Sequence, residues 1–288
     1  MKNYTLGLYE KAMPKDLTWK EKLLAAKEAG YDFVEISIDE TDEKLARLDM
    51  PKEERLELVR MMAEIGVPLR TMCLSGHRKY PLGSRDPDTC RRGMEIMEKA
   101  IRLSEDLGIR IIQLAGYDVY YEESSCDTKA RFAENLEKAV QMAAKAGIVM
   151  GFETMETEFM NTVEKAMHYV RRMNSPYLNV YPDSGNITNA AVSYKADVLD
   201  DLRSGAGHLA AMHLKETVPG VFREVPYGTG HVDFESLVHA AWELGVRRFV
   251  TEFWYTGSAD WKKDLHEARA MMGALLDAER EKEVTRTA

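Results

Sequence analysis

The sequence predicts an α/β fold made of a single (β/α)8 barrel domain over residues 1–288. Short apolar runs alternate with longer amphipathic stretches, and eight such pairs occur along the chain, which matches this barrel in number and length. Several amphipathic stretches end in Gly, which adopts the left-handed conformation that closes a helix. A doubly wound open sheet is the alternative, but its first turn is normally rich in glycine, and "GLYEKAMPKD" is not.

The eight apolar runs are the expected strands. In chain order they are "TLGLYE" (5–10), "FVEIS" (33–37), "LRTMCL" (69–74), "IIQLAG" (111–116), "VMGFE" (149–153), "LNVYPD" (178–183), "LAAMHLK" (209–215) and "FVTEF" (249–253). The amphipathic stretches are the expected helices, because they are rich in Ala, Leu, Glu, Lys and Met. They cover residues 18–30, 51–66, 87–108, 127–147, 161–173, 192–205, 233–245 and 259–281, and the polar residues 282–288 are expected to be a tail.

The composition excludes several classes of protein. The formal net charge of −9 opposes nucleic acid as the main partner, because phosphate backbones bind clustered Lys and Arg. The sequence contains no run of about 18 apolar residues, so no transmembrane helix is predicted. The first residues lack the apolar region of a signal peptide. The three Cys residues show no CxxC spacing, which favours free thiols in a reducing cytosol. We therefore expect a cytoplasmic protein that binds neither membranes nor nucleic acid.

The last four expected strands each end in a side chain that can bind a metal. These side chains are Glu153, Asp183, His213 and Glu252. Catalytic groups of such barrels lie at the carboxyl ends of the strands, so the four are expected to meet. Taken singly, each is also compatible with a loop residue, a helix cap or a packed histidine. Together they predict a site for one divalent ion (Mn²⁺, Zn²⁺, Co²⁺ or Mg²⁺), which would offset the charge of three buried carboxylates.

Two of these acids can also move protons. Strands five and eight lie three positions apart around an eight-stranded ring, so Glu153 and Glu252 are expected on nearly opposite sides of the barrel mouth. Two opposed carboxylates can remove a proton from one face of a bound molecule and return a proton to the other. A metal between them would stabilise the charge that develops on a carbonyl and its neighbouring hydroxyl. This arrangement predicts epimerisation or isomerisation of a keto sugar.

Five further residues are candidates for substrate binding. His77 and Arg78 belong to a basic segment after strand three, on the same face as the acids, and suit an anionic group such as phosphate. Lys215 and Arg223 follow strand seven, Arg223 within a loop rich in Gly and Pro, and Asn186 follows Asp183 in "DSGN". The alternative for His77 and Arg78 is a solvated charged segment. The alternative for Arg223 is a surface arginine, and Asn186 could instead only cap a turn.

These segments resemble a known family. "MCLSGHRKYPLGS", "IQLAGYDVYY", "GFETME", "YPDSGN", "HLKET", "PGVFREVPYGTGHVDFE" and "TEFW" are together similar to the bacterial L-ribulose-5-phosphate/L-xylulose-5-phosphate 3-epimerases of the xylose isomerase-like TIM-barrel superfamily. The resemblance implies that Glu153, Asp183, His213 and Glu252 hold one divalent metal and that the two glutamates exchange the proton on C3. It also implies that Arg223 contacts the substrate. Related ketose 3-epimerases carry His three residues after the metal-binding Asp, where this chain has Asn186.

The predicted function is therefore a metal-dependent 3-epimerase. It would interconvert L-ribulose 5-phosphate and L-xylulose 5-phosphate by proton exchange at C3 through an enediolate, in pentose or ascorbate catabolism. The alternatives are a 3-epimerase or aldose–ketose isomerase of another ketose or hexulose 6-phosphate, a nuclease on the same barrel, and a sugar-binding protein without activity. The resemblance implies a small-molecule sugar phosphate as partner and a homodimer or homotetramer.

Overall fold

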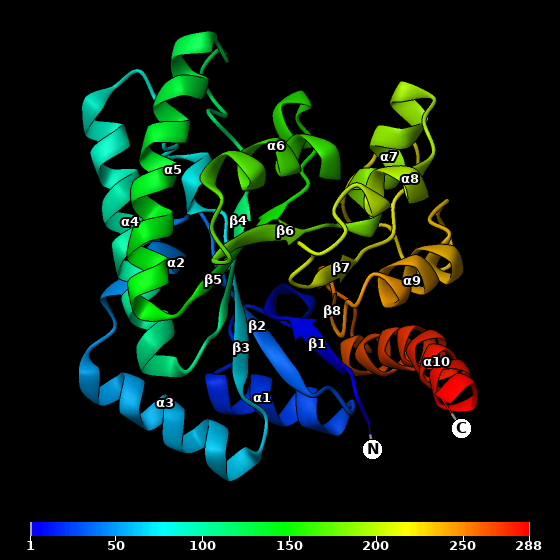
Figure 1. Cartoon of the computed structure of the whole chain (residues 1–288). Coiled ribbons are helices and arrows are strands. Elements are labelled where there is room, and N and C mark those ends of the chain that lie inside the picture. Colours follow the sequence, from blue (N-terminus) through cyan, green and yellow to red (C-terminus); the bar gives the residue numbers. More distant parts are fainter. Residues whose placement is uncertain (1, 288) are drawn as a thin grey trace.

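The computed structural model describes residues 2–287 and shows a barrel of eight parallel strands surrounded by helices (Figure 1), which confirms the predicted fold class. The strands pair in the order β6-β5-β4-β3-β2-β1-β8-β7, and isolated parallel bridges join the β6 and β7 sides, so that the ring is nearly closed. The strands are β1 (Thr5–Tyr9), β2 (Phe33–Ile38), β3 (Leu69–Leu74), β4 (Ile111–Ala115), β5 (Val149–Glu153), β6 (Leu178–Tyr181), β7 (Met212–Leu214) and β8 (Arg248–Thr251).

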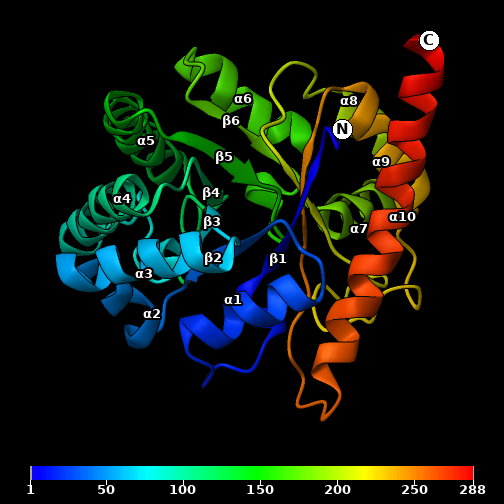
Figure 2. The ribbon, with the colours of Figure 1, turned by 90° about the horizontal axis from the view of Figure 1, so that it is seen from below.

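The helices form an outer layer around the strands, as the view from below shows (Figure 2). They are α1 (Trp19–Glu28), α2 (Asp42–Ala46), α3 (Lys52–Ile65), α4 (Pro87–Leu107), α5 (Cys126–Ala146), α6 (Val163–Met173), α7 (Ser184–Tyr194), α8 (Val198–Arg203), α9 (Phe234–Glu243) and α10 (Trp261–Thr287). Short 3-10 turns are η1 (Glu10–Ala12), η2 (Arg47–Asp49), η3 (Gly76–Arg78) and η4 (Glu158–Met160). None of the helices in residues 2–287 has the length and apolar character needed to cross a bilayer.

Two expected elements differ from the structure. The single helix expected at 192–205 is replaced by α7 and α8, and α7 begins directly after β6 because the side chain of Asp183 caps its first turn. The polar residues expected as a tail continue helix α10 as far as Thr287, and residue 288 lies outside the described residues. The polar composition of these residues is compatible with a solvent-exposed helix as well as with a tail, so it could not distinguish the two.

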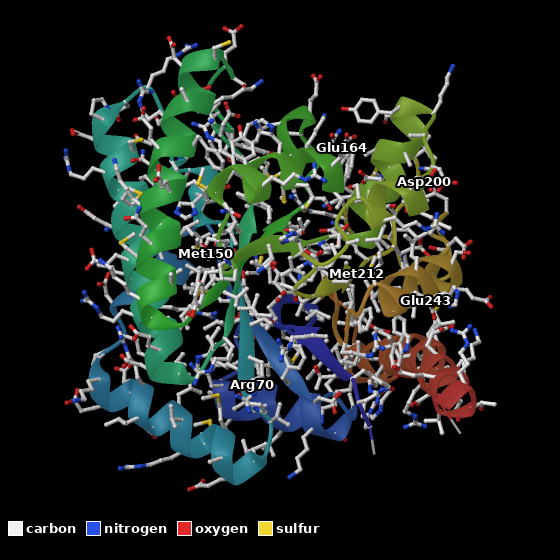
Figure 3. All side chains as sticks on the ribbon, in the orientation of Figure 1. Arg70, Met150, Glu164, Asp200, Met212 and Glu243 are labelled. Carbon is white, nitrogen blue, oxygen red and sulfur yellow. The ribbon has the colours of Figure 1, made fainter. Side chains whose placement is uncertain are left out.

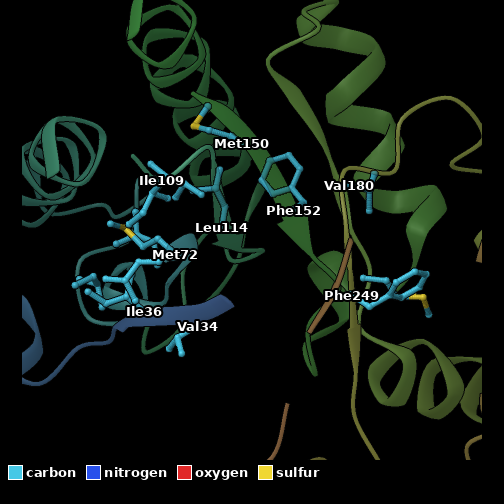
Figure 4. Packing of buried hydrophobic residues seen from close by; sticks show 14 of the residues in the cluster. Val34, Ile36, Met72, Ile109, Leu114, Met150, Phe152, Val180 and Phe249 are labelled. Atoms are coloured by element: carbon cyan, nitrogen blue, oxygen red, sulfur yellow. The ribbon is translucent and has the colours of Figure 1, made fainter. Parts of the chain in front are cut away.

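The alternation of side chains along each strand builds two apolar layers. In β2, Val34 and Ile36 point outward and pack against the helices in the main core, part of which is shown in Figure 4. Phe33, on the opposite face, belongs to a smaller cluster with Tyr9 and other residues of the barrel interior. Charged side chains such as the labelled Glu164, Asp200 and Glu243 lie on the outer helices (Figure 3). The barrel interior, in contrast, carries the polar groups described below.

A buried charge cluster joins β1 to the first helices. Glu10, directly after β1, is 1% exposed, and its carboxylate contacts Arg47 Nη1 at 2.6 Å, Lys22 Nζ at 3.4 Å and Lys44 Nζ. It also accepts a hydrogen bond from the backbone N–H of Ser37 at 2.9 Å. Burial alone would raise the pKa of Glu10, but the charges of Arg47, Lys44 and Lys22 lower it to about 2.

Replacing Glu10 by Gln is expected to lower the free energy of unfolding by about 3–5 kcal/mol at pH 7, because three cations would lose their buried counter-charge. Since the folded-state pKa lies below the ordinary value of 4.5, the stabilisation by Glu10 is complete above that value and is lost as the pH falls toward about 2. Urea unfolding followed by circular dichroism at several pH values measures both effects. Asp106→Asn, which breaks an exposed pair with Arg55, is the control and should change stability by less than about 1 kcal/mol. A Glu10→Gln variant as stable as the control would contradict this account.

Candidate metal centre and active site

Four buried side chains from β5 to β8 meet at the carboxyl end of the barrel. Each of them offers one ligand atom, and these atoms all lie within 4.8 Å of one another. None of the four residues is more than 5% exposed. The four residues are Glu153, Asp183, His213 and Glu252. The structure thus brings together all four residues that the sequence proposed as metal ligands.

The segment after β6 sets the orientation of Asp183. Its Oδ1 accepts a hydrogen bond from the backbone N–H of Asn186 at 2.7 Å and caps α7, which leaves Oδ2 without a partner. A parallel bridge pairs Asp183 with His213. Gly185 allows α7 to begin this close to the β7 loop, since a Cβ atom there would lie 2.4 Å from Thr217 Cγ2. "DSGN" therefore fixes one oxygen of Asp183 and directs the other into the cluster.

The unpaired atoms of the cluster fit a divalent cation. Asp183 Oδ2, His213 Nδ1 and Glu252 Oε2 are buried and have no hydrogen-bond partner, although buried polar atoms normally have one. His213 Nδ1 lies 3.1 Å from Glu252 Oε2 and 3.5 Å from Glu153 Oε1, so the free positions converge on one place. Carboxylate oxygens and one imidazole nitrogen are donors that suit Mn²⁺, Zn²⁺, Co²⁺ and Mg²⁺.

The electrostatics of the cluster also favour a positive charge at its centre. Burial opposes protonation of His213, but the charges of Glu35 and Glu252 raise the pKa of His213 well above its usual value. Lys215 Nζ lies 3.1 Å from Asp183 Oδ1 and 3.6 Å from Glu252 Oε2 and offsets part of the negative charge. Without a bound cation, the carboxylates therefore favour a protonated imidazole at His213. A cation at the centre of the cluster would neutralise the carboxylates instead.

The two glutamates of the cluster differ in their affinity for protons. Burial and the negative charge of Glu252 raise the pKa of Glu153. Burial acts in the same direction on Glu252, but the positive charges of Lys215 and His213 lower the pKa of Glu252 below its usual range. A pair of acids whose pKa values are driven apart can include one proton donor and one proton acceptor at the same pH.

A cavity of about 140 Å³ opens beside the cluster. Its walls include both glutamates of the cluster and four of the five expected substrate-binding residues, which are Arg78, Asn186, Lys215 and Arg223. His77 is not among the residues that line the cavity: it is 4% exposed, and its Nε2 pairs with the backbone oxygen of Gly93 at 3.0 Å. Burial lowers the pKa of His77 to about 4, so the ring is neutral at pH 7 and offers no charge to an anion.

Asn186 lines the cavity and carries a hydrogen-bond acceptor without a partner. Its Nδ2 donates to the backbone oxygen of Thr154 at 2.6 Å, which fixes the orientation of the amide. Its Oδ1 is buried and has no partner. The amide oxygen is therefore free to accept a hydrogen bond from a hydroxyl group in the cavity.

The mouth of the cavity carries a network that the sequence did not reveal. Arg223 Nη2 contacts Glu156 Oε1 at 3.3 Å, and Glu156 Oε2 accepts a hydrogen bond from the hydroxyl of Tyr117 at 2.7 Å. Arg78 Nη2 in turn donates to the Tyr117 hydroxyl at 3.3 Å. Lys11, after β1, also lines the cavity. Glu156 was not among the predicted site residues, because it lies three residues after Glu153 and beyond the end of the expected strand.

Glu35 is a second residue that the predicted site did not include. It lies within β2, is fully buried, and places Oε1 2.6 Å from His213 Nε2. Its other oxygen accepts a hydrogen bond from the hydroxyl of Tyr181 at 3.0 Å. One signal was present in the sequence, namely an acidic residue between apolar neighbours inside a buried strand.

Comparisons with known proteins agree with the geometry. Residues 23–275 match the family model described as a xylose isomerase-like TIM barrel. The chain is 44% identical over 276 residues to the L-ribulose-5-phosphate 3-epimerase UlaE of Escherichia coli O157:H7, with 96% of each chain covered. Identity and coverage are the same for the protein of that name from Salmonella heidelberg strain SL476, at 44% and 96%.

Solved structures share the fold at lower identity. A structure of L-ribulose 3-epimerase superposes with a TM-score of 0.79 at 21% identity and covers 99% of this chain and 98% of its own. A D-psicose 3-epimerase crystallised in the presence of D-fructose gives a TM-score of 0.78 at 16% identity, with 94% and 99% covered. At these identities the superpositions support the barrel architecture.

Proposed function

This chain belongs to the xylose isomerase-like TIM-barrel family and, within it, to the L-ribulose-5-phosphate 3-epimerases, and on that basis we propose that it interconverts L-ribulose 5-phosphate and L-xylulose 5-phosphate as a metal-dependent isomerase. The observation that carries the proposal is the buried cluster of three carboxylates and one imidazole, two of whose acids also line the adjoining cavity. The reaction inverts C3 of a ketose phosphate, so it needs one group that removes a proton and another that returns a proton.

Glu153 and Glu252 are the groups that we assign to proton transfer. In one direction, Glu252 is ionised and accepts the C3 proton, and Glu153 donates a proton to the opposite face; in the reverse direction the two exchange roles. Both residues are almost fully buried and line the cavity, so each can reach a bound substrate. A divalent ion bound by Glu153, Asp183, His213 and Glu252 would supply Lewis-acid stabilisation of the charge that develops on the substrate oxygens.

The remaining cavity residues orient the sugar phosphate. The free Oδ1 of Asn186 accepts a hydrogen bond from a hydroxyl, and Arg223 contacts the substrate from the mouth. The phosphate binds Arg78 and Lys11, the cations on the side of the cavity formed by the segments after β3 and β1. Lys215 holds Asp183 and Glu252 in place through its two ion pairs.

Replacing Arg78 by Met is expected to lower kcat/KM for L-xylulose 5-phosphate by about 10- to 100-fold, because a charge-assisted contact to the phosphate is lost. The turnover of unphosphorylated L-xylulose should change much less. Steady-state kinetics with both substrates measures the difference, and Lys79→Met in the same segment, at an exposed pair with Asp42, is the matched control. Equal losses on both substrates would show that Arg78 does not bind the phosphate.

The direct test of the proposed reaction is incubation of the metal-loaded protein with L-xylulose 5-phosphate in D2O, followed by NMR. Deuterium at C3 together with the appearance of L-ribulose 5-phosphate is the expected result. Label at C1 with formation of an aldose would identify an aldose–ketose isomerase instead. Unlabelled substrate would leave a sugar-binding protein as the better description.

The biological setting follows from the resemblance seen in the sequence. We place the reaction in pentose or ascorbate catabolism in the cytosol. All three cysteines are unpaired, as expected for a reducing compartment. We propose a homodimer or homotetramer as the functional assembly, which sedimentation analysis of the purified protein would test.

A further inference from the structure

Glu35 takes no part in the proton transfer proposed above, yet it occupies the barrel interior directly beside the cluster. An irregularity between β2 and β3 precedes it: Val34 pairs with Leu69, whereas Glu35 pairs with Thr71, so that Arg70 is an extra residue on β3. The side chain of Arg70 is exposed, and the residue is labelled at the lower part of the barrel in Figure 3. Such bulges alter the direction of neighbouring side chains and are frequent next to active sites.

The contacts of Glu35 are few and specific. Its Oε1 lies 2.6 Å from His213 Nε2, and its Oε2 accepts a hydrogen bond from the hydroxyl of Tyr181 at 3.0 Å. The ring of Tyr181 packs against the imidazole, with 4.7 Å between the ring centroids. Within residues 2–287, the structure pairs Glu35 with no Lys or Arg. A fully buried carboxylate that no Lys or Arg neutralises is unfavourable, so its pairing with His213 needs an explanation beyond packing.

These contacts determine what the imidazole can offer to the cluster. A carboxylate accepts hydrogen bonds, so the hydrogen shared by Glu35 and His213 is carried by Nε2. The opposite nitrogen, Nδ1, faces Glu153 and Glu252. A histidine that binds a metal usually donates its other N–H to a carboxylate, which fixes the tautomer and the angle of the ring.

We infer that Glu35 is a positioning residue for metal binding, which orients His213 and keeps a hydrogen on Nε2 so that Nδ1 offers its lone pair to a divalent cation. Tyr181 holds Glu35 in turn, through the second carboxylate oxygen. This inference rests on the metal centre of the proposed function and extends it to a residue from β2, outside the four strands that supply the cluster.

Metal affinity tests the inference without reference to activity. Titration of metal-free protein with Mn²⁺ in a calorimeter should give a dissociation constant about 10- to 100-fold higher for Glu35→Gln than for the wild type. Tyr181→Phe removes the hydrogen bond to Glu35 and should weaken binding in the same direction by a smaller factor. Ser37→Ala changes the next interior position of β2, which contacts Tyr9 rather than His213, and should leave the affinity unchanged.

The outcomes separate this inference from the proposed function. Wild-type affinity in a folded Glu35→Gln variant would overturn the positioning role alone, whereas a wild-type protein that binds no Mn²⁺ would overturn the metal centre and this inference with it. If Glu35→Gln fails to fold, Tyr181→Phe and the ¹⁵N spectrum of the histidines in Zn²⁺-loaded wild-type protein decide the matter. The spectrum should show His213 with hydrogen on Nε2, and hydrogen on Nδ1 would overturn the inference.

Discussion

Replacing either Glu153 or Glu252 by Gln is expected to lower kcat for epimerisation by about 10²- to 10⁴-fold, because an amide cannot exchange a proton with C3. The two variants should differ in the partial reaction that each can still perform. Each retains one carboxylate on one face of the sugar, so each should still exchange the C3 proton of one epimer with solvent and not that of the other. The pattern is expected because the two acids line the same cavity from β5 and β8.

NMR in D2O with each pentulose 5-phosphate separately measures this exchange. Glu158→Gln changes an exposed acid in the same segment as Glu153 and serves as the control, which should keep wild-type rates. Because both glutamates are also proposed metal ligands, the metal content of each variant must be measured beside the kinetics. Variants that retain the metal and show no difference between the two epimers would contradict the assignment of opposed proton-transfer groups.

Removing the metal is expected to abolish the reaction, and adding Mn²⁺ or Zn²⁺ should restore it. Without a bound metal, the basic groups of residues 2–287 that pair with the three buried carboxylates and offset their charge are Lys215 and His213. Metal binding should therefore also raise the unfolding temperature, since a ligand at about 1,000 times its Kd adds about 4 kcal/mol of stability. Activity and thermal unfolding before and after treatment with a chelator measure both effects.

Asp183→Asn and Asp201→Asn form a matched pair for this experiment. Each aspartate accepts hydrogen bonds at the start of a helix, Asp183 at α7 and Asp201 at the backbone N–H groups of Val163 and Glu164 in α6. Only Asp183 belongs to the cluster. Asp183→Asn should therefore lose restoration by added metal, and Asp201→Asn should keep it. Full restoration in Asp183→Asn would contradict the ligand set.

Much of the fold and the cluster could be predicted because both follow from repeated patterns. The alternation of apolar and amphipathic segments fixed the barrel, and the last residues of four successive strands had to meet at one end of it. Glu153, His213 and Glu252 lie at or directly beside the last residue of a strand, so counting along the strands located them. Asp183, two residues beyond β6, was found in the same way.

The rest of the site depends on contacts between segments that are distant in the sequence. His77 belongs to the same basic segment as Arg78, but the turn η3 directs its ring toward Gly93 in α4 and away from the cavity. Glu35 reaches His213 across 178 positions of sequence, and no local pattern encodes that pairing. The segment "SGN" after Asp183 resembled a turn. In the structure a helix begins there, because the side chain of Asp183 accepts a hydrogen bond from the backbone N–H of Asn186.

The central claim is that one divalent cation is held jointly by side chains from β5, β6, β7 and β8. Anomalous scattering from crystals grown with Zn²⁺ tests it most directly. The expected result is a single strong peak about 2.0–2.2 Å from one ligand atom each of Glu153, Asp183, His213 and Glu252. Crystals without a peak among these four residues, or with Zn²⁺ bound elsewhere in the cavity while the four side chains keep the present arrangement, would contradict it.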